Sequence, residues 1–303
     1  MGWAINNLKA REIFESITKH TSRHGGTSTA IFGPMGAGKT TLLWHFTQLI
    51  QAKDPVTNRW NPEIRIWRGR APIDNWTFSS PEKTIVYIHE DDNVNFSLEL
   101  TDRFIYPNLE RYKEVPDLIK KILEDPYKLH VVYEPRKYKK SWLLDEVLDQ
   151  IESTVNIPKR LKSSIFWFEM VYYLVKIFPK SGQRNFYCLY FDEADQVFPG
   201  RPAQKIQWHL QEWLRDNIVD TRKAYVSFFV ATHNYEDLDW RVIKKFQYKI
   251  WGSGAIPPKR GSLVSSSKTL LMKTGTFVLE GKGFGSTKFP PLPELHRAMI
   301  DFL

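Results

Sequence analysis

The chain has 303 residues and 42% hydrophobic content, enough for one large domain or for one domain with a small appendage. Its formal net charge of +9 suits contact with nucleic acid or with an anionic membrane surface. The single cysteine, Cys188, excludes a disulfide framework and a thiolate metal site, which favours a reducing compartment. Residues 1–30 lack the apolar core of a signal peptide, and the most apolar run, residues 164–178, is short and interrupted by charges. We therefore expect a cytoplasmic protein without a transmembrane segment.

Apolar periodicity predicts alternating strands and helices along the chain, which argues for an α/β fold of three layers with a mostly parallel central sheet. The N-terminal segment, residues 1–26, is expected to be helical, and residues 27–303 form the main domain. The tail, residues 252–303, is predicted as a loop and a β-hairpin with strands at residues 269–273 and 276–280. The other expected strands are residues 28–32, 63–68, 84–89, 128–134, 185–191, 224–231 and 246–251, and the expected helices are residues 5–20, 41–50, 141–151, 164–178 and 203–217. Residues 90–128 are charged and interrupted by prolines, with a helix expected around residues 115–123.

The most specific motif lies between the first strand and the helix that follows it. It fits the pattern G-x-x-x-x-G-K-[ST], a loop whose backbone N–H groups surround the phosphates of a nucleotide. Lys39 is expected to reach the β- and γ-phosphates, and the Thr40 hydroxyl is expected to bind Mg²⁺. The predicted nucleotide-binding residues are Gly33, Pro34, Met35, Gly36, Ala37, Gly38, Lys39, Thr40 and Thr41.

An acidic pair supplies the second half of such a site, because the apolar strand at residues 185–191 runs directly into Asp192-Glu193. Asp192 is expected to complete the Mg²⁺ shell with Thr40. Glu193 is expected to orient or deprotonate the water that attacks the γ-phosphate. The pair favours an ATP hydrolase over a nucleotide kinase or a simple nucleotide-binding module.

The next strand, residues 224–231, ends at Thr232-His233-Asn234. A polar side chain at this tip, beside the acidic pair, is expected to contact the γ-phosphate or the attacking water. Successive side chains on a strand alternate faces, so only one or two of the three can point at the site. The alternative is an ordinary polar turn between a strand and a loop.

Two known classes of nucleotide enzyme are disfavoured. Asp192-Glu-Ala-Asp195 spells the box of a helicase superfamily, but too few residues follow Asp195 for the second RecA-like domain that such helicases need. GTPases are disfavoured because the guanine-binding motif Asn-Lys-x-Asp is missing from the sequence.

Four segments follow one another in an order that is typical of one family. They are Phe191-Asp-Glu-Ala-Asp-Gln-Val-Phe-Pro-Gly-Arg201, then Glu212-Trp-Leu-Arg215, Ala231-Thr-His233 and Asp237-Leu-Asp-Trp-Arg-Val-Ile-Lys-Lys245. Together they resemble the FtsK/HerA superfamily of DNA-pumping ATPases, and within it the Zot-like morphogenesis ATPases. The late hairpin, which ends in Gly283-Phe-Gly-Ser-Thr-Lys-Phe-Pro-Pro-Leu-Pro293, is similar to the closing strand pair of these ATPases, and His233 stands where the family usually has Gln.

This resemblance implies a RecA-like P-loop NTPase of the ASCE type, a homo-oligomer that usually forms a hexameric ring with ATP between subunits. It also implies an arginine from the neighbouring subunit on the γ-phosphate, for which Arg201, Arg215 and Arg241 are candidates, each with an alternative as a surface ion-pair residue. The expected activity is Mg²⁺-dependent ATP hydrolysis that moves double-stranded DNA, in packaging or export of a viral or mobile genome. If the protein is viral, the resemblance implies action in the host cytoplasm, with a capsid or membrane protein as a candidate partner.

Two other functions fit the same motifs. One is an AAA+ or signalling ATPase that uses ATP as an assembly switch, with Asn234 as its sensor. The other is a motor that moves polypeptide. For DNA contact, two basic runs mix cations with aromatics, residues 65–70 around Trp67 and residues 136–140, although both also fit ordinary strand flanks.

Overall fold

The computed structural model describes residues 4–5, 8–101, 103–137, 159–182, 184–202, 205–293 and 296–303. The chain divides into two compact units, the first made of Met1–Glu63 with Arg184–Pro291 and the second of Ile64–Gln183 with Leu292–Leu303. The expected helix at residues 141–151 lies outside the described residues, and the expected boundary at residue 26 stays a prediction. Among the described residues, no helix is long and apolar enough to cross a membrane.

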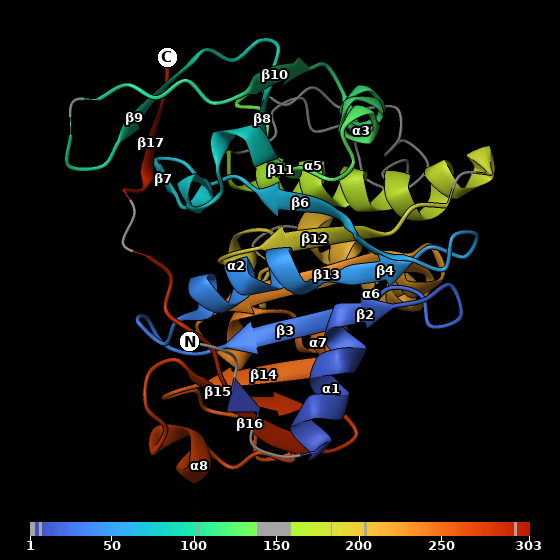
Figure 1. The fold of residues 1–303 in the computed structure, drawn as a ribbon, viewed down its shortest axis with the longest axis vertical. Helices are drawn as coiled ribbons and strands as arrows, with labels where there is room; N and C mark the ends of the chain where they lie inside the picture. The colour runs from blue at the N-terminus through green and yellow to red at the C-terminus, as the bar shows by residue number, and fades with distance from the viewer. Residues whose placement is uncertain are drawn as a thin grey trace. The chain divides into compact units, whose positions relative to one another are not determined.

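The first unit is organised around parallel strands (Figure 1). Every residue of β3 (Ser28–Phe32), β12 (Tyr187–Phe191) and β13 (Val226–Thr232) is buried. Strands covered on both faces need such continuous apolar runs. β13 lies between β3 and β12 and pairs in parallel with both, while β14 (Tyr248–Gly252) pairs in parallel with the other side of β3.

Beyond β14 the sheet of this unit becomes antiparallel, in the order β14, β15 (Thr276–Glu280), β16 (Phe284–Lys288) and β1 (Ala4–Ile5). The C-terminal strand pair is therefore β15 with β16. The prediction of a strand at residues 269–273 is wrong, because α8 (Ser266–Leu270) occupies that place. The buried Thr269 hydroxyl donates to the carbonyl groups of Ala255 and Ser266, which fixes a helical turn there.

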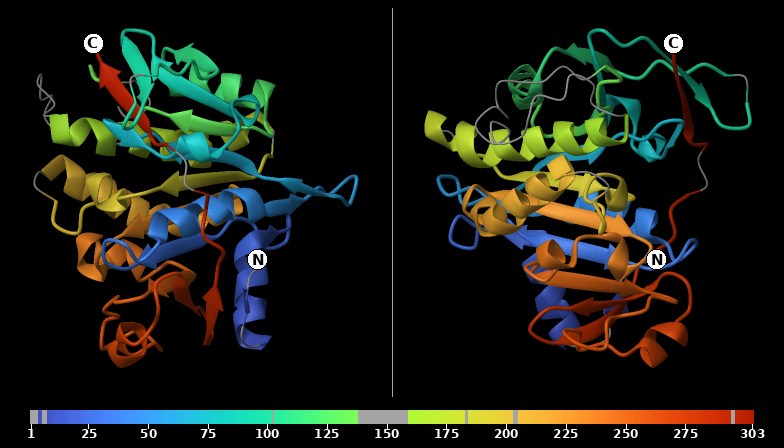
Figure 2. Two further views of the ribbon diagram at one scale, coloured as in Figure 1. Left: turned by 60° about the vertical axis from the view of Figure 1, so that its left-hand side comes forward. Right: turned by 180° about the vertical axis from the view of Figure 1, so that it is seen from behind.

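Helices cover both faces of this sheet, as Figures 1 and 2 show. α2 (Lys39–Leu49) and α6 (Lys205–Lys223) both pack against β13, on opposite faces. In α2 the buried stripe includes Leu42, Leu43 and Phe46, and the Phe46 ring lies 5.0 Å from that of Phe229 on β13. The predicted α/β sandwich with a mostly parallel sheet is thus confirmed. The unit also contains α1 (Leu8–Thr18), β2 (Lys19–His20), β4 (Gln51–Lys53), β5 (Trp60–Pro62), α7 (Trp240–Ile243) and the short helices at Ala194–Gln196 and Tyr235–Asp237.

The second unit has its own parallel strands in the order β6 (Ile64–Arg68), β11 (Leu129–Val132), β8 (Thr84–His89) and β10 (Leu109–Tyr112). A second, antiparallel sheet joins β7 (Ile73–Asp74) and β9 (Val94–Leu98) to β17 (Ala298–Phe302) at the end of the chain. Among its described residues, the helices of this unit are α3 (Val115–Glu124) and α5 (Lys159–Tyr172), with short helical turns at Trp76–Phe78, Pro81–Lys83, Tyr173–Ile177 and Phe178–Ser181.

The helix expected around residues 115–123 is confirmed as α3. The strands β9 and β10, which occupy residues before it, were not predicted. β9 pairs with β17, some 200 residues further along the chain, so the pattern around β9 alone does not reveal its partner. Proline and charged residues in this region hid two edge strands from the sequence prediction.

Candidate active site

The loop between β3 and α2 has the backbone shape that a phosphate-binding loop requires. Gly36 and Gly38 adopt φ values of +78° and +90°, a region that residues with a Cβ rarely adopt. Gly38 is also the N-cap of α2, and a Cβ placed on it would lie 3.0 Å from the Phe289 ring. The loop and the start of α2 thus present backbone N–H groups at a helix N-terminus, where an anion is favoured.

Lys39 lies inside this loop, and 7% of it is exposed. Its Nζ donates to the carbonyl oxygens of Gly33 at 2.7 Å and Pro34 at 3.1 Å. Burial lowers the pKa of Lys39, and the carboxylates of Asp192 and Glu193 act in the opposite direction. A cation held by carbonyl groups near two carboxylates is suited to a polyanion, which would replace the carbonyl contacts.

The other eight predicted loop residues surround Lys39. Pro34, Met35 and Gly36 are exposed at the tip of the loop, and Met35 is 88% exposed. Gly33 and Ala37 are buried and approach each other closely, because a Cβ on Gly33 would lie 2.9 Å from the Ala37 Cβ. Gly38, Thr40 and Thr41 are half-buried at the start of α2.

The acidic strand end meets the loop directly. The Thr40 hydroxyl donates to Asp192 Oδ2 at 2.8 Å, and Asp192 is buried at the end of β12. A hydroxyl and a carboxylate are oxygen ligands of the kind that Mg²⁺ takes beside the phosphates of a nucleotide. The residues present therefore fit the expected metal, with Thr40 and Asp192 as its protein ligands.

Glu193 follows Asp192 in a strained conformation. Its φ of +50° is unusual for a residue other than glycine. Its backbone N–H donates to Asp192 Oδ1 at 3.2 Å, and its Oε2 accepts a 2.7 Å hydrogen bond from the Gln196 amide. Strain of this kind, held by surrounding contacts, is typical of functional sites. Glu193 is half-buried and begins the short turn that follows β12 and Asp192.

The tip of β13 lies between the loop and the acidic pair because β13 lies between their strands. His233 contacts the loop twice, since its carbonyl accepts from Gly33 N at 3.2 Å and its Nδ1 lies 3.3 Å from Lys39 Nζ. Thr232 instead bonds Asp195 and Asp237, at 3.2 and 3.4 Å. Asn234 caps a short helix through Asp237. Of the three predicted sensor residues, His233 is the one bonded to the loop lysine.

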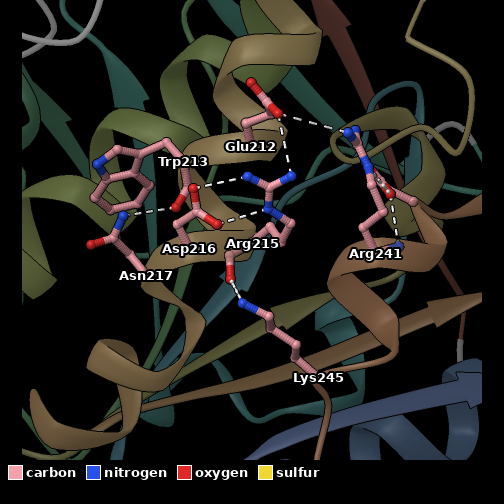
Figure 3. A network of polar contacts seen from close by, with 8 residues as sticks. Glu212, Trp213, Arg215, Asp216, Asn217, Arg241 and Lys245 are labelled. Carbon is pink, nitrogen blue, oxygen red and sulfur yellow. Dashed lines mark hydrogen bonds and ion pairs between the residues drawn. The ribbon is translucent and has the colours of Figure 1, made fainter.

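Two of the three candidate arginines are held by acids of their own chain (Figure 3). Arg241 pairs with Asp239 at 2.7 Å and approaches Glu212 at 4.0 Å. Arg215 pairs with Glu212 and with Asp216, at 3.2 and 2.7 Å. Arg201 is exposed in the turn after the acidic pair, and it has no ion pair with any residue that the structure describes.

The predicted nucleic-acid role of residues 65–70 is wrong for its buried members. Arg65, Trp67 and Arg68 are 9%, 1% and 4% exposed, because they lie on the covered strand β6. Arg68 pairs with Glu134 and Arg65 donates to the Tyr127 carbonyl. Of the second basic run, Arg136 is exposed and donates to the Phe302 carbonyl at 3.0 Å, and residues 138–140 lie outside the described part.

Four residues near the site were not predicted as functional. Asp195 and Asp237 hold Thr232, and Gln196 holds Glu193. Asp195 and Gln196 lie within the acidic segment, so that motif contained a signal for them. Phe289, which packs against Gly38, is 251 positions away in sequence, and no local pattern places it there.

No protein-family model and no curated protein sequence matches the chain. Among solved structures it is similar to the genome packaging NTPase B204 from Sulfolobus turreted icosahedral virus 2 in complex with ATP-gammaS, with 15% identity and a TM-score of 0.40 over 88% of this chain and 98% of that one. It is also similar to the cytoplasmic domain of the type VII secretion ATPase EccC of Thermomonospora curvata, with 10% identity and a TM-score of 0.38 over 90% of this chain and 24% of that one. A third similar structure is the N-terminal domain of zonular occludens toxin from Neisseria meningitidis, with 14% identity and a TM-score of 0.29 over 85% of this chain and 84% of that one.

Proposed function

We propose that this chain is a Mg²⁺-dependent ATPase that couples ATP hydrolysis to the movement of DNA, in packaging or export of a viral or mobile genome. The observation that supports it most is the 2.8 Å contact between Thr40 and Asp192, which joins the phosphate loop to the acidic strand end. Glu193 follows at the same edge of the sheet, where a hydrolase needs a base.

Each site residue has a distinct part in the proposed reaction. Lys39 leaves the Gly33 and Pro34 carbonyls and binds the β- and γ-phosphates. The Glu193 carboxylate orients the attacking water and accepts its proton. His233, bonded to Lys39 Nζ, links the γ-phosphate region to β13. Thr40 and Asp192 would hold Mg²⁺, which would supply charge neutralisation on the phosphate oxygens.

The arginine that completes the site comes from a neighbouring subunit in this proposal. Arg201 is the favoured candidate because Arg215 and Arg241 are already neutralised by acids of their own chain. An exposed guanidinium can reach a second copy without breaking such pairs. An arginine supplied in trans contributes on the order of 10³–10⁵ in the rate of phosphoryl transfer.

DNA-stimulated ATP hydrolysis tests the coupling. Steady-state ATPase rates are measured with and without double-stranded DNA at several salt concentrations. Stimulation that weakens as salt rises is expected, because phosphate contacts release counterions. The Glu193→Gln variant provides the background rate of contaminating ATPases. Turnover that DNA leaves unchanged even at low salt would favour an ATP-dependent assembly switch over a DNA motor.

A further inference from the structure

A small sheet of the first unit, in the order β2, β4 and β5, lies beside the start of β3 (Figure 1). β2 pairs in parallel with β4, and the hairpin that joins β4 to β5 brings Lys53 opposite Trp60. The Asp54 side chain accepts hydrogen bonds from the N–H groups of Val56 and Thr57, at 2.8 and 2.7 Å. These bonds fix the turn of the hairpin, so the two strands present their side chains in one defined register.

One face of this small sheet is fixed to the interior of the first unit. His20 on β2 and Ala52 on β4 are partners in the sheet, and both are buried. The His20 ring contacts the buried Glu63 carboxylate through Nδ1 and the Thr27 hydroxyl through Nε2. Side chains of a strand alternate between the two faces, so the residues next to His20 and Ala52 point away from the interior.

The outward face gathers positive charge around one aromatic ring. Lys19 from β2 and Lys53 from β4 each place Nζ 5.9 Å from the centroid of the Trp60 ring. Trp60 is 39% exposed, and Arg59, which precedes it, is also exposed. The three strands contain no acid, and none of these cations forms an ion pair within the described part of the chain. An anionic ligand would relieve the repulsion between the like charges.

Two other exposed tryptophans of the first unit have a cation beside the ring, but their surroundings differ. Trp208 has Arg241 5.6 Å from its ring centroid, and the charge of that arginine is neutralised by Asp239 at 2.7 Å. Trp240 has one cation beside it, Lys244, and directly follows Asp239 in the chain. By contrast, the ring on the hairpin has two cations from two strands, and neither is paired with an acid.

We propose that this outward face, the hairpin platform of Lys19, Lys53, Arg59 and Trp60, binds single-stranded DNA. A base that is not paired in a duplex stacks on the exposed ring, and the cations bind the phosphates on either side of it. The lysines can leave the ring for these phosphates, because cation–π contacts at exposed sites are weak. The choice of DNA over RNA rests on the proposed function, whereas the binding of a single strand rests on the platform itself.

Other anionic polymers match the platform less well. A DNA duplex or a run of acidic residues in a peptide would satisfy the cations, but neither offers a free aromatic face to the Trp60 ring. The platform also lies apart from the nucleotide site. β2 and β4 lie beside the start of β3, and the phosphate-binding loop follows its end, five residues further along the strand. Substitutions on the platform are therefore expected to leave ATP binding and basal hydrolysis unchanged.

Fluorescence anisotropy with a short labelled oligo(dT) tests the platform. Trp60→Leu is expected to bind this strand about 10-fold more weakly, the loss typical of one base–aromatic stack, while Trp60→Phe keeps most of the affinity. The same substitution should leave the binding of a duplex of oligo(dA) and oligo(dT) unchanged, because the bases of a duplex are already stacked on one another.

Salt dependence tests the phosphate contacts separately. The slope of log K for oligo(dT) against log salt concentration is measured for the native chain and for the double variant Lys19→Gln, Lys53→Gln. Removing the two lysines should lower the magnitude of this slope by about 1.4, since each phosphate contact of a single strand contributes about 0.7. An unchanged slope would overturn the phosphate contacts.

A matched control carries Trp240→Leu and Lys244→Gln, an exposed ring and its cation outside the platform, and should bind oligo(dT) as the native chain does. Native affinity in Trp60→Leu, an equal loss in the control, or an equal loss with the duplex would overturn the stacking site. Tighter binding of oligo(U) RNA than of oligo(dT) would overturn the choice of DNA.

The test also distinguishes the platform from the proposed function, because binding is measured without ATP. A native chain that binds oligo(dT) through the platform but does not hydrolyse ATP would refute the proposed ATPase and leave the platform standing. A native chain that hydrolyses ATP but does not bind oligo(dT) would overturn the platform and leave the ATPase standing.

Discussion

The Thr40 hydroxyl donates a hydrogen bond to the Asp192 carboxylate although the two residues are 152 positions apart in the sequence. The order of the strands explains this meeting. β13 separates β3 from β12, so the loop after β3 and the acidic end of β12 flank the tip of β13 at one edge of the sheet. Ligands of open α/β sheets bind at this edge, outside the carboxyl ends of the strands.

Asp192→Asn is expected to weaken ATP binding roughly 10- to 100-fold when Mg²⁺ is present, the range observed when residues that support a metal site are replaced. Binding of ATP without the metal should be nearly unchanged. The amide removes one negative charge from the predicted metal ligands but keeps the size of the side chain. Titration of a fluorescent ATP analogue with and without Mg²⁺ measures this. Asp220→Asn, at an acid on α6 away from the site, is the control. Equal weakening with and without metal would contradict a role for Asp192 in metal binding.

Glu193→Gln is expected to bind ATP normally and to hydrolyse it about 10²–10⁴ times more slowly, because an amide cannot accept the proton of the attacking water. The backbone at Glu193 should be unaffected, since Gln keeps the shape of the side chain and can still contact Gln196. Single-turnover hydrolysis and equilibrium binding separate the two steps. A variant that hydrolyses ATP at the native rate would remove Glu193 from the chemistry.

The sequence predicts those parts of the candidate site whose residues are consecutive in the chain. The phosphate loop, Asp192 and Glu193 each stand next to an apolar strand, so local patterns located them. The placement of His233 on Lys39 required knowing that β13 lies between β3 and β12, which strand patterns do not state. The burial of Arg68 was also hidden, because the residue pattern predicts a strand at residues 63–68 but does not show that the strand is covered on both faces.

The fold could be predicted well where elements are long and apolar. β3, β8 and β12 were located to within two residues, and α3 to within one. The failures share a physical cause, since β9, β17 and α8 are short and depend on partners far away in the chain. β17 exists as a strand because β9 and β7 flank it, and neither neighbour is visible from the residues of β17.

The buried Asp74 is expected to make the second unit less stable as pH rises. It is 2% exposed and accepts hydrogen bonds from the Tyr133 hydroxyl and from Arg70 N, both at 2.9 Å. Burial raises its pKa from 3.8 to about 6, so the folded state holds the proton more tightly than the unfolded state does. The stability that this proton provides is complete below pH 3.8 and is lost as pH rises through about 6. The loss amounts to about 3 kcal/mol.

Asp74→Asn should lack this titration. Urea unfolding between pH 4 and 7 is expected to show the native chain losing about 2 kcal/mol relative to the variant over this range, most of the total effect. The exposed Asp301→Asn on β17 is the control, and its difference from the native chain should stay constant. Parallel curves for Asp74→Asn and the native chain would show that Asp74 does not titrate in this window.

Alanine substitutions at Gly36 and Gly38 are expected to distinguish the cost of backbone strain from the cost of a steric clash with Phe289. Both Gly36 and Gly38 have positive φ, so a Cβ at either position should cost ~1–2 kcal/mol of folding free energy. A Cβ on Gly36 meets nothing within 4 Å, whereas one on Gly38 lies 3.0 Å from the Phe289 ring. Gly38→Ala should therefore be the more destabilising of the two when unfolding is measured without nucleotide, which keeps phosphate binding out of the comparison.

A second substitution identifies the source of the difference. Phe289→Leu shortens the side chain that faces Gly38. In the double variant with Gly38→Ala, the free energy of unfolding should therefore rise to that of Gly36→Ala. Combined with Gly36→Ala, Phe289→Leu should recover nothing, because that position is open. Equal losses at the two glycines, or equal recovery at both, would show that Phe289 does not press on the loop. Recovery at Gly38 alone would establish that the segment after β16 helps to shape the phosphate-binding loop.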